Sequence, residues 1–174
     1  MLILLTTSQR PQIIKALSID NMQASPGAYK FVIDGKDLKQ GRPGYKPERL
    51  VLRTYPCDRR LCVHNYLSVY LQKTLDFRGK NRNLILTTKK PFKPATTNTV
   101  SRWVKTVLNE AGVDTDVYKP GSTRMAAASK AKRGGVPLDE ILKQGGWTRR
   151  TTFADFYDRP INVPSKDFGK VVLN

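Results

Sequence analysis

The sequence has few of the residues that build metal or nucleotide sites. Among its 174 residues it has two cysteines, Cys57 and Cys62, and one histidine, His64. These are too few ligands to predict a zinc site, so we expect both cysteines to be free thiols and assign His64 no role. The sequence also has no GxxxxGK[ST] motif, which argues against a phosphate-binding P-loop.

Long hydrophobic runs are missing as well. The apolar stretch at the N-terminus, Met1 to Leu5, is too short for the core of a signal peptide or for a membrane span. We therefore expect no membrane association and no secretion. The expected location is the nucleus if the source is eukaryotic, and the cytoplasm otherwise.

Acidic residues are scarce relative to basic ones. The chain has 31 Lys and Arg against 14 Asp and Glu, for a net charge of +17. Such an excess attracts polyanions, and no basic amphipathic helix or lipidation signal directs it toward a membrane surface. With 39% apolar residues the chain can bury a core, so we expect a nucleic-acid-binding globular protein with one domain over 1–174.

Apolar periodicity predicts a mixture of helices and strands. The apolar run at the N-terminus and the helical spacing of Ile13, Ile14 and Leu17 place Arg10 between two helical segments. Alternation predicts strands over 29–34 and 49–55, joined by a connection rich in Gly, Pro and Lys, and a short strand over 84–86. Helices are predicted over 61–75, after a cap at Thr96 or Thr97, and over 122–133, 138–144 and 151–157.

Four segments together carry a family resemblance. They are TTSQRPQIIKAL, DLKQGRPG, KPGSTRMAAASKAKRGGVPLDEILKQGGW and TTFADFYDRP. In this order they resemble the tyrosine recombinase (phage integrase) family, and most closely its eukaryotic transposon-borne members. The most specific parts are GSTR before a small-residue helix, then GGW, then FYDRP. The resemblance extends from before Arg10 to just past Tyr157.

The resemblance implies a role for each matching residue. Arg10 and Arg124 correspond to the arginine pair that clamps the scissile phosphate, a task that suits their forked donors. Lys39 resembles the lysine that protonates the departing 5′ oxygen, with Lys36 and Lys46 as further candidates. The remaining two residues are Trp147, which would donate a hydrogen bond to the phosphate, and Tyr157, which would be the nucleophile. No metal, ATP or organic cofactor is implied.

Two departures from the family pattern bear on activity. The family has histidine three residues before the second arginine, and here that position is Gly121. Glycine cannot accept or donate a proton. We therefore expect the loss of a general acid/base contribution to the reaction rate, which is roughly a hundredfold or more. The family also has a separate N-terminal DNA-clamping domain, which we do not expect in this chain because the resemblance to the catalytic domain already begins before Arg10. We therefore expect an isolated catalytic domain, a truncated gene product or a decayed mobile element. The first helix is itself expected to be incomplete.

The sequence also allows other functional interpretations. A non-catalytic DNA-binding protein, either a recombinase-derived remnant or a helix-turn-helix protein, fits the spacing of Ala131, Gly135 and Ile141. A ribosomal or other RNA-associated protein fits the charge alone, and a type IB topoisomerase would share the chemistry.

The interpretation we favour is an α+β fold, a mainly helical tyrosine-recombinase-like catalytic domain with a small antiparallel sheet. Its expected partners are double-stranded DNA and further copies of itself on that DNA, with no small-molecule substrate. The tail, 162–174, is expected to pack on a neighbouring protomer.

Overall fold

Two short helices and a small antiparallel sheet form the first part of the fold. The structure is a computed structural model that describes residues 1–33, 48–147 and 150–156. The strands follow the spatial order β1-β2-β3, and each is antiparallel to its neighbour. The elements are α1 (Leu2–Thr7), α2 (Pro11–Ala16), β1 (Met22–Ser25), β2 (Ala28–Ile33) and β3 (Glu48–Arg53).

The described chain beyond β3 is mainly helical. Thr96 caps one of its longer helices, because its Oγ1 accepts a hydrogen bond from the backbone N–H of Thr99 at 3.2 Å. The predicted α+β class, mainly helical with a small antiparallel sheet, is confirmed. The elements are the 3-10 turn η2 (Arg59–Leu61), α3 (Val63–Arg78), α4 (Thr97–Glu110), α5 (Ser122–Arg133), α6 (Leu138–Gly145) and α7 (Arg150–Phe156).

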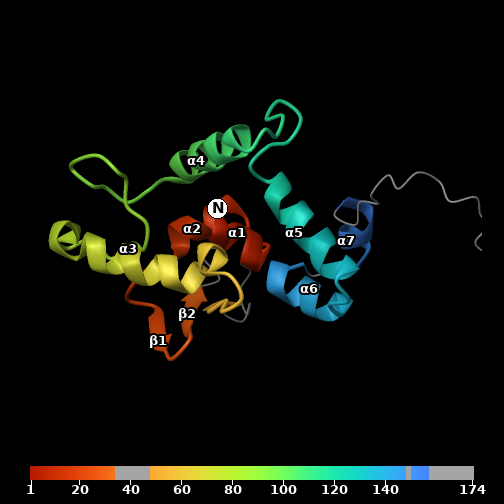
Figure 1. Cartoon of the computed structure of the whole chain (residues 1–174), viewed down its shortest axis with the longest axis horizontal. Coiled ribbons are helices and arrows are strands. Elements are labelled where there is room, and N and C mark those ends of the chain that lie inside the picture. Colours follow the sequence, from red (N-terminus) through yellow and green to blue (C-terminus); the bar gives the residue numbers. More distant parts are fainter. Residues whose placement is uncertain (34–47, 148–149, 157–174) are drawn as a thin grey trace, which may run out of the picture.

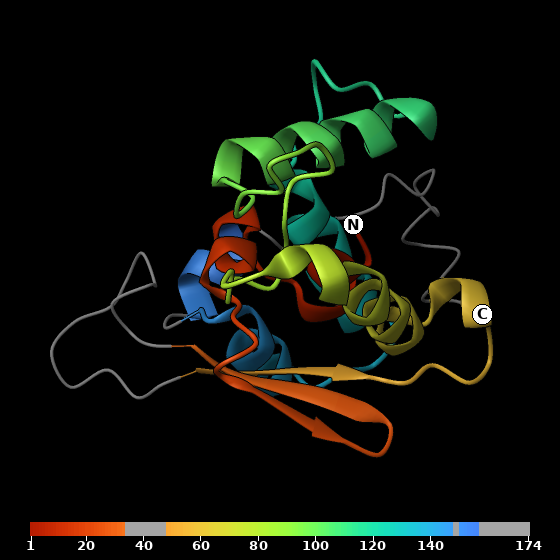
Figure 2. The same ribbon diagram turned by 90° about the vertical axis from the view of Figure 1, so that its left-hand side faces the viewer.

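The central strand β2 has the alternation that its sequence predicts. Phe31 and Ile33 are buried, whereas Lys30 before them and Val32 between them are exposed. Because successive side chains of a strand point to opposite faces, one face of the sheet supports the core. Figure 2 shows the helices on one side of this sheet, and α3 crosses it.

Buried apolar side chains form two clusters, which we call the sheet core and the C-terminal core. The sheet core lies between the sheet and helices α1 to α4. The C-terminal core joins α5, α6 and α7 around Trp147. Figure 1 shows α5, α6 and α7 gathered at one end of the molecule, with α3, β1 and β2 toward the other end and α1 between them. Helix α1 touches both groups, since it packs on β3 and on α5.

One predicted strand is absent from the described chain. Residues 84–86 form no strand there; isolated bridges join Asn83 to Ser18 and Leu86 to Pro94. The buried guanidinium of Arg78 donates to the carbonyls of Asn83 and Leu84, so these carbonyls bond a side chain. The strand prediction over 84–86 is therefore wrong. Strand β1, by contrast, was not predicted.

None of the described helices is long and apolar enough to cross a membrane.

Candidate functional site

The junction between α1 and α2 positions Arg10. Helix α1 ends at Ser8, whose φ of 55° and ψ of 25° lie in the left-handed region. Arg10 is extended and precedes Pro11, the first residue of α2. Proline lacks an N–H and disfavours a helical conformation in the residue before it, so it begins α2 and holds Arg10 outside the helix. The predicted position of Arg10 between two helices is confirmed.

Arg124 lies in the first turn of α5 and is almost fully buried, with 2% of its surface exposed. Its Nη1 donates a hydrogen bond to the backbone carbonyl of Ser8 at 3.0 Å. Its Cζ lies 3.8 Å from the centroid of the Trp147 ring. The guanidinium is thus held by a carbonyl and by the face of an indole, a cation–π contact that suits arginine.

Ser8 and Arg124 are linked in both directions. The Ser8 Oγ donates to the backbone carbonyl of Arg124 at 2.9 Å, and the Ser8 carbonyl accepts from the Arg124 side chain. Arg10 is two residues after Ser8, so its Cα lies within about 8 Å of the Ser8 Cα. The two arginines that the sequence analysis paired are therefore brought into the same region.

Trp147 follows α6 and is buried, with 8% of its surface exposed. Gly146 ends the helix with a φ of 68°, a conformation that favours glycine. A Cβ on Gly145 would overlap the six-membered ring of the indole. Both glycines of the GGW motif thus have a structural role in placing Trp147.

Helix α7 packs on Trp147 through Phe153. The two ring centroids are 5.3 Å apart, with the planes at 80°, and Phe153 is 1% exposed. This edge-to-face contact packs α7 against Trp147, whose ring also contacts the Arg124 guanidinium. The described part of α7 ends at Phe156, the residue before Tyr157 in the sequence.

Other predicted site residues lie outside the described residues. These are Tyr157 and the three lysines of the connection between β2 and β3, Lys36, Lys39 and Lys46. Their proposed roles stay predictions. Among the predicted site residues, the structure places Arg124 in contact with Trp147, and Arg124 bonds Ser8, two residues before Arg10.

Gly121 is the N-cap residue of α5, one turn before Arg124. It is exposed, its φ is −68°, and no atom lies within 4 Å of the position that a Cβ would take. The backbone here would therefore admit a side chain. The chain's single histidine, His64, is in α3 and stacks on Tyr29 of β2, with ring centroids 4.7 Å apart.

The cysteines lie in another part of the fold, between β3 and α3. Cys57 is exposed and Cys62 is buried, and both are free. Backbone N–H groups of Tyr55 and then Asn65 donate to the Cys62 sulfur, which lowers the pKa of this thiol. Within the described residues, no group of three His, Cys, Asp or Glu side chains is arranged to hold a metal ion.

Comparison with known structures identifies the fold. XerH site-specific recombinase bound to difH substrate, in a pre-cleavage complex, matches with a TM-score of 0.68 and 18% identity, over 92% of this chain and 42% of that one. The fold is that of a site-specific recombinase. XerA recombinase gives a TM-score of 0.67 with 18% identity over 91% of this chain and 50% of that one.

A further match is XerH bound to palindromic difH substrate, in a post-cleavage complex. Its TM-score is 0.65 with 17% identity, over 87% of this chain and 39% of that one. The chain therefore spans half or less of the length of these recombinases. No protein-family model matches the sequence, and no curated protein sequence matches it significantly.

Sequence reasoning missed two residues that assemble the site, Ser8 and Gln9. Ser8 bonds Arg124, and the Gln9 Nε2 donates to the backbone carbonyl of Gln144 at 2.8 Å, near the end of α6. In the sequence they are only polar residues before Arg10. Their partners lie 116 and 135 positions away, and no periodicity signals contacts of that range.

Proposed function

We propose that this chain is a tyrosine recombinase catalytic domain that cleaves and rejoins DNA strands in site-specific recombination or integration. The observation that supports the proposal is the link between Ser8 and Arg124, which joins the junction that carries Arg10 to the Arg124–Trp147 pair within a fold similar to that of site-specific recombinases. The net charge of +17 suits binding to a DNA backbone.

The proposed reaction is a transesterification at phosphorus. The Tyr157 oxygen attacks the scissile phosphate and passes its proton to water, the bond to the 5′ oxygen breaks, and a 3′-phosphotyrosyl bond forms. Arg10 and Arg124 stabilise the charge on the non-bridging oxygens, and Lys39 protonates the departing 5′ oxygen. The energy of the phosphodiester is kept in the new bond, so the reverse attack by a 5′ hydroxyl rejoins the strand.

The desolvated position of Arg124 supports its proposed role. A cation at 2% exposure interacts with a phosphate in a medium of lower effective dielectric than water. The hydrogen bond to Ser8 and the indole face fix its orientation before the phosphate arrives, so little reorganisation accompanies the reaction.

The proposal also covers the partners of the chain, its origin and its cellular location. We propose double-stranded DNA as the substrate and an oligomer on that DNA, because each protomer offers one tyrosine for one strand. An origin in a eukaryotic transposon, with residence in the nucleus, rests on the sequence resemblance alone.

Gly121 favours one alternative, a recombinase-derived DNA-binding protein that no longer cleaves. The residue is exposed and has no side chain to move a proton, at one turn from Arg124. With only water to accept the proton of Tyr157, attack on the phosphate would be slow. This alternative keeps the fold and the DNA binding but predicts no covalent intermediate.

Trapping of the covalent intermediate distinguishes a cleaving recombinase from a DNA-binding protein that no longer cleaves. The chain is incubated with nicked suicide duplexes taken from the ends of the element that carries its gene, then denatured and resolved by size. We expect a DNA adduct that disappears in Tyr157→Phe and persists in Tyr66→Phe, a matched change at an exposed tyrosine of α3. Binding of these ends without any adduct would support the non-cleaving alternative.

A further inference from the structure

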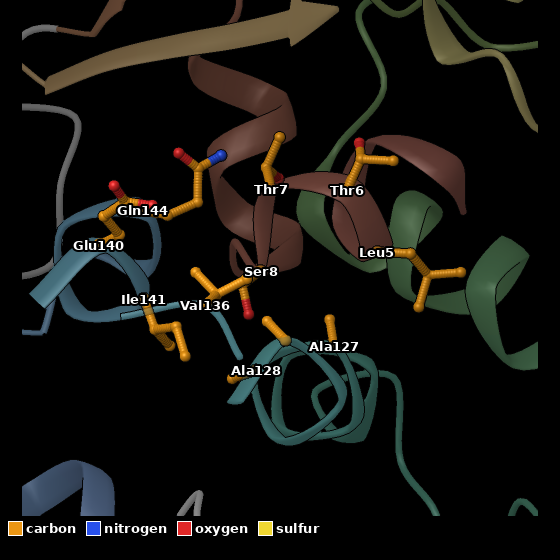
Figure 3. Close-up of a pocket in the computed structure, with 11 residues that line it drawn as sticks. Leu5, Thr6, Thr7, Ser8, Ala127, Ala128, Val136, Glu140, Ile141 and Gln144 are labelled. Atoms are coloured by element: carbon orange, nitrogen blue, oxygen red, sulfur yellow. The ribbon is translucent and has the colours of Figure 1, made fainter. Parts of the chain in front are cut away.

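The junction between α1 and α2 is fastened to two helices by adjacent side chains. The Ser8 hydroxyl donates to the carbonyl of Arg124 in α5, and the Gln9 amide donates to the carbonyl of Gln144 in α6. Both residues are buried, at 7% and 5% exposure. Figure 3 shows the Ser8 hydroxyl directed toward α5, at a cavity of about 290 Å³ between α1, α5 and α6.

The conformation of Ser8 indicates that its side chain has a purpose beyond the turn. A φ of 55° lies in the left-handed region, where glycine is favoured over residues with a Cβ. A turn alone would be served better by glycine. The serine hydroxyl, however, makes a directional bond to the helix that carries Arg124.

The bond from Ser8 is not needed to satisfy the carbonyl of Arg124. This residue lies in the first turn of α5, so its carbonyl also faces the N–H groups of the following helical turn. The hydroxyl therefore contributes mainly to the register between α1 and α5. The Arg124 side chain returns the contact by donating to the Ser8 carbonyl, which fixes the direction of the guanidinium.

Gln9 has a different partner but the same geometric effect. Carbonyls in the last turn of a helix have no partner within the helix, and the Gln9 amide fills this need at Gln144. Gln144 is three residues before Trp147. The junction that carries Arg10 is thus tied to the segments that carry Arg124 and Trp147.

We propose that Ser8 is a positioning residue that sets the separation of Arg10 from Arg124. Gln9 sets the position of the junction between α1 and α2 relative to Trp147. The inference deepens the proposed function and rests on it. Neither Ser8 nor Gln9 is proposed to touch the substrate. They act through the two arginines, whose spacing must match the two non-bridging oxygens of one phosphate.

The central test is Ser8→Gly, because glycine keeps the left-handed turn and removes only the hydroxymethyl group. We expect an unchanged or higher melting temperature together with a cleavage rate that falls roughly 10- to 100-fold in single turnover, since small misplacements of reacting groups have effects of this size. Gln9→Met, which removes the amide at similar length, should shift the rate in the same direction. Thr6→Ala is the matched control, because the Thr6 hydroxyl bonds carbonyls within α1 only.

A second readout does not need cleavage. Inorganic phosphate is titrated calorimetrically into the whole chain, and the binding lost in Arg10→Gln defines the component at the arginine pair. We expect Ser8→Gly to weaken this component severalfold. Unchanged phosphate affinity and cleavage rate in Ser8→Gly would assign the serine to stability alone and overturn the proposal.

The two readouts separate failure of the inference from failure of the proposed function. A wild-type chain that binds phosphate through Arg10 but forms no adduct contradicts the cleavage reaction, while the titration still decides the role of Ser8. A wild-type chain whose phosphate binding is the same as that of Arg10→Gln overturns both.

Discussion

At the scale of single residues, the burial of Arg124 is the most consequential feature. Removing a charge from water is unfavourable unless hydrogen bonds and neighbouring dipoles compensate for it. Here the Ser8 carbonyl and the face of Trp147 provide part of that compensation. Truncation of a paired buried charge disturbs stability as well as function, so Arg124 variants alone would not separate the two.

Gly121 gives a cleaner test of chemistry at the same scale. We predict that Gly121→His raises the rate of adduct formation by about 100-fold or more, because an imidazole one turn before Arg124 can accept the tyrosine proton. The stability should change by no more than about 0.5 kcal/mol, since the residue is exposed and its Cβ position is open. Single-turnover adduct formation and thermal unfolding measure the two quantities.

The control for this variant is Gly121→Ala, which adds a Cβ without a proton carrier. Equal rates for the alanine and histidine variants would contradict the chemical role of this position and would leave only a backbone effect.

At the scale of elements, apolar periodicity was sufficient to predict most of the fold. The predicted helix over 122–133 coincides with α5, and the predicted helix over 138–144 ends one residue before the end of α6. The predicted helix over 151–157 begins one residue after the start of α7, and its last residue lies outside the described residues. The strand β1 escaped notice because its four residues, MQAS, show no alternation and no β-branched side chains. Its pairing with β2 through a tight turn at Gly27 stabilises it instead.

The site was only partly predictable for a related reason. Motif order predicted that Arg10, Arg124 and Trp147 belong to one site, and the structure places Arg124 on the Trp147 ring and bonds it to Ser8, two residues before Arg10. The bonds that assemble them come from Ser8 and Gln9, whose partners are fixed by how α1 packs on α5 and α6. Such contacts follow from tertiary packing, which a local pattern does not encode.

Cys62 allows a prediction about one element. Its sulfur caps α3 by accepting from the N–H of Asn65 and also accepts from the N–H of Tyr55. Cys62→Ala should lower the free energy of unfolding by about 1 kcal/mol, the usual effect of losing a cap. Cys62→Ser should retain most of it, because the hydroxyl oxygen is also an acceptor. Urea denaturation followed by circular dichroism measures both variants; equal stability of the two would contradict the capping role.

At the scale of the whole molecule, the site lies where the two cores meet. Arg10 belongs to a junction whose neighbouring helix α2 packs in the sheet core, while Trp147 belongs to the C-terminal core. Helix α1 packs on β3 and on α5 and so connects the two. The relative position of the cores therefore determines the position of the Arg10 backbone relative to Trp147.

Net charge supports a prediction at this largest scale. With +17 on this chain, we expect DNA affinity to fall by roughly 10³- to 10⁵-fold between about 50 and 200 mM salt, as for proteins that make several phosphate contacts. Fluorescence anisotropy of a labelled duplex at several salt concentrations gives the slope. Arg10→Gln should reduce its magnitude by about one, whereas a wild-type affinity that does not depend on salt would contradict phosphate-dominated binding.

The contact between Arg124 and Trp147 has an optical consequence. The chain has two tryptophans, and one of them has a guanidinium 3.8 Å from the centroid of its ring. The other, Trp103, packs in the sheet core. Indole emission is sensitive to a nearby charge, so an anion that engages Arg124 changes the light emitted by Trp147 and leaves that of Trp103 as an internal reference. Trp147 would therefore report the binding of an anion at Arg124 without any attached dye. A Trp103→Phe variant would isolate the Trp147 emission.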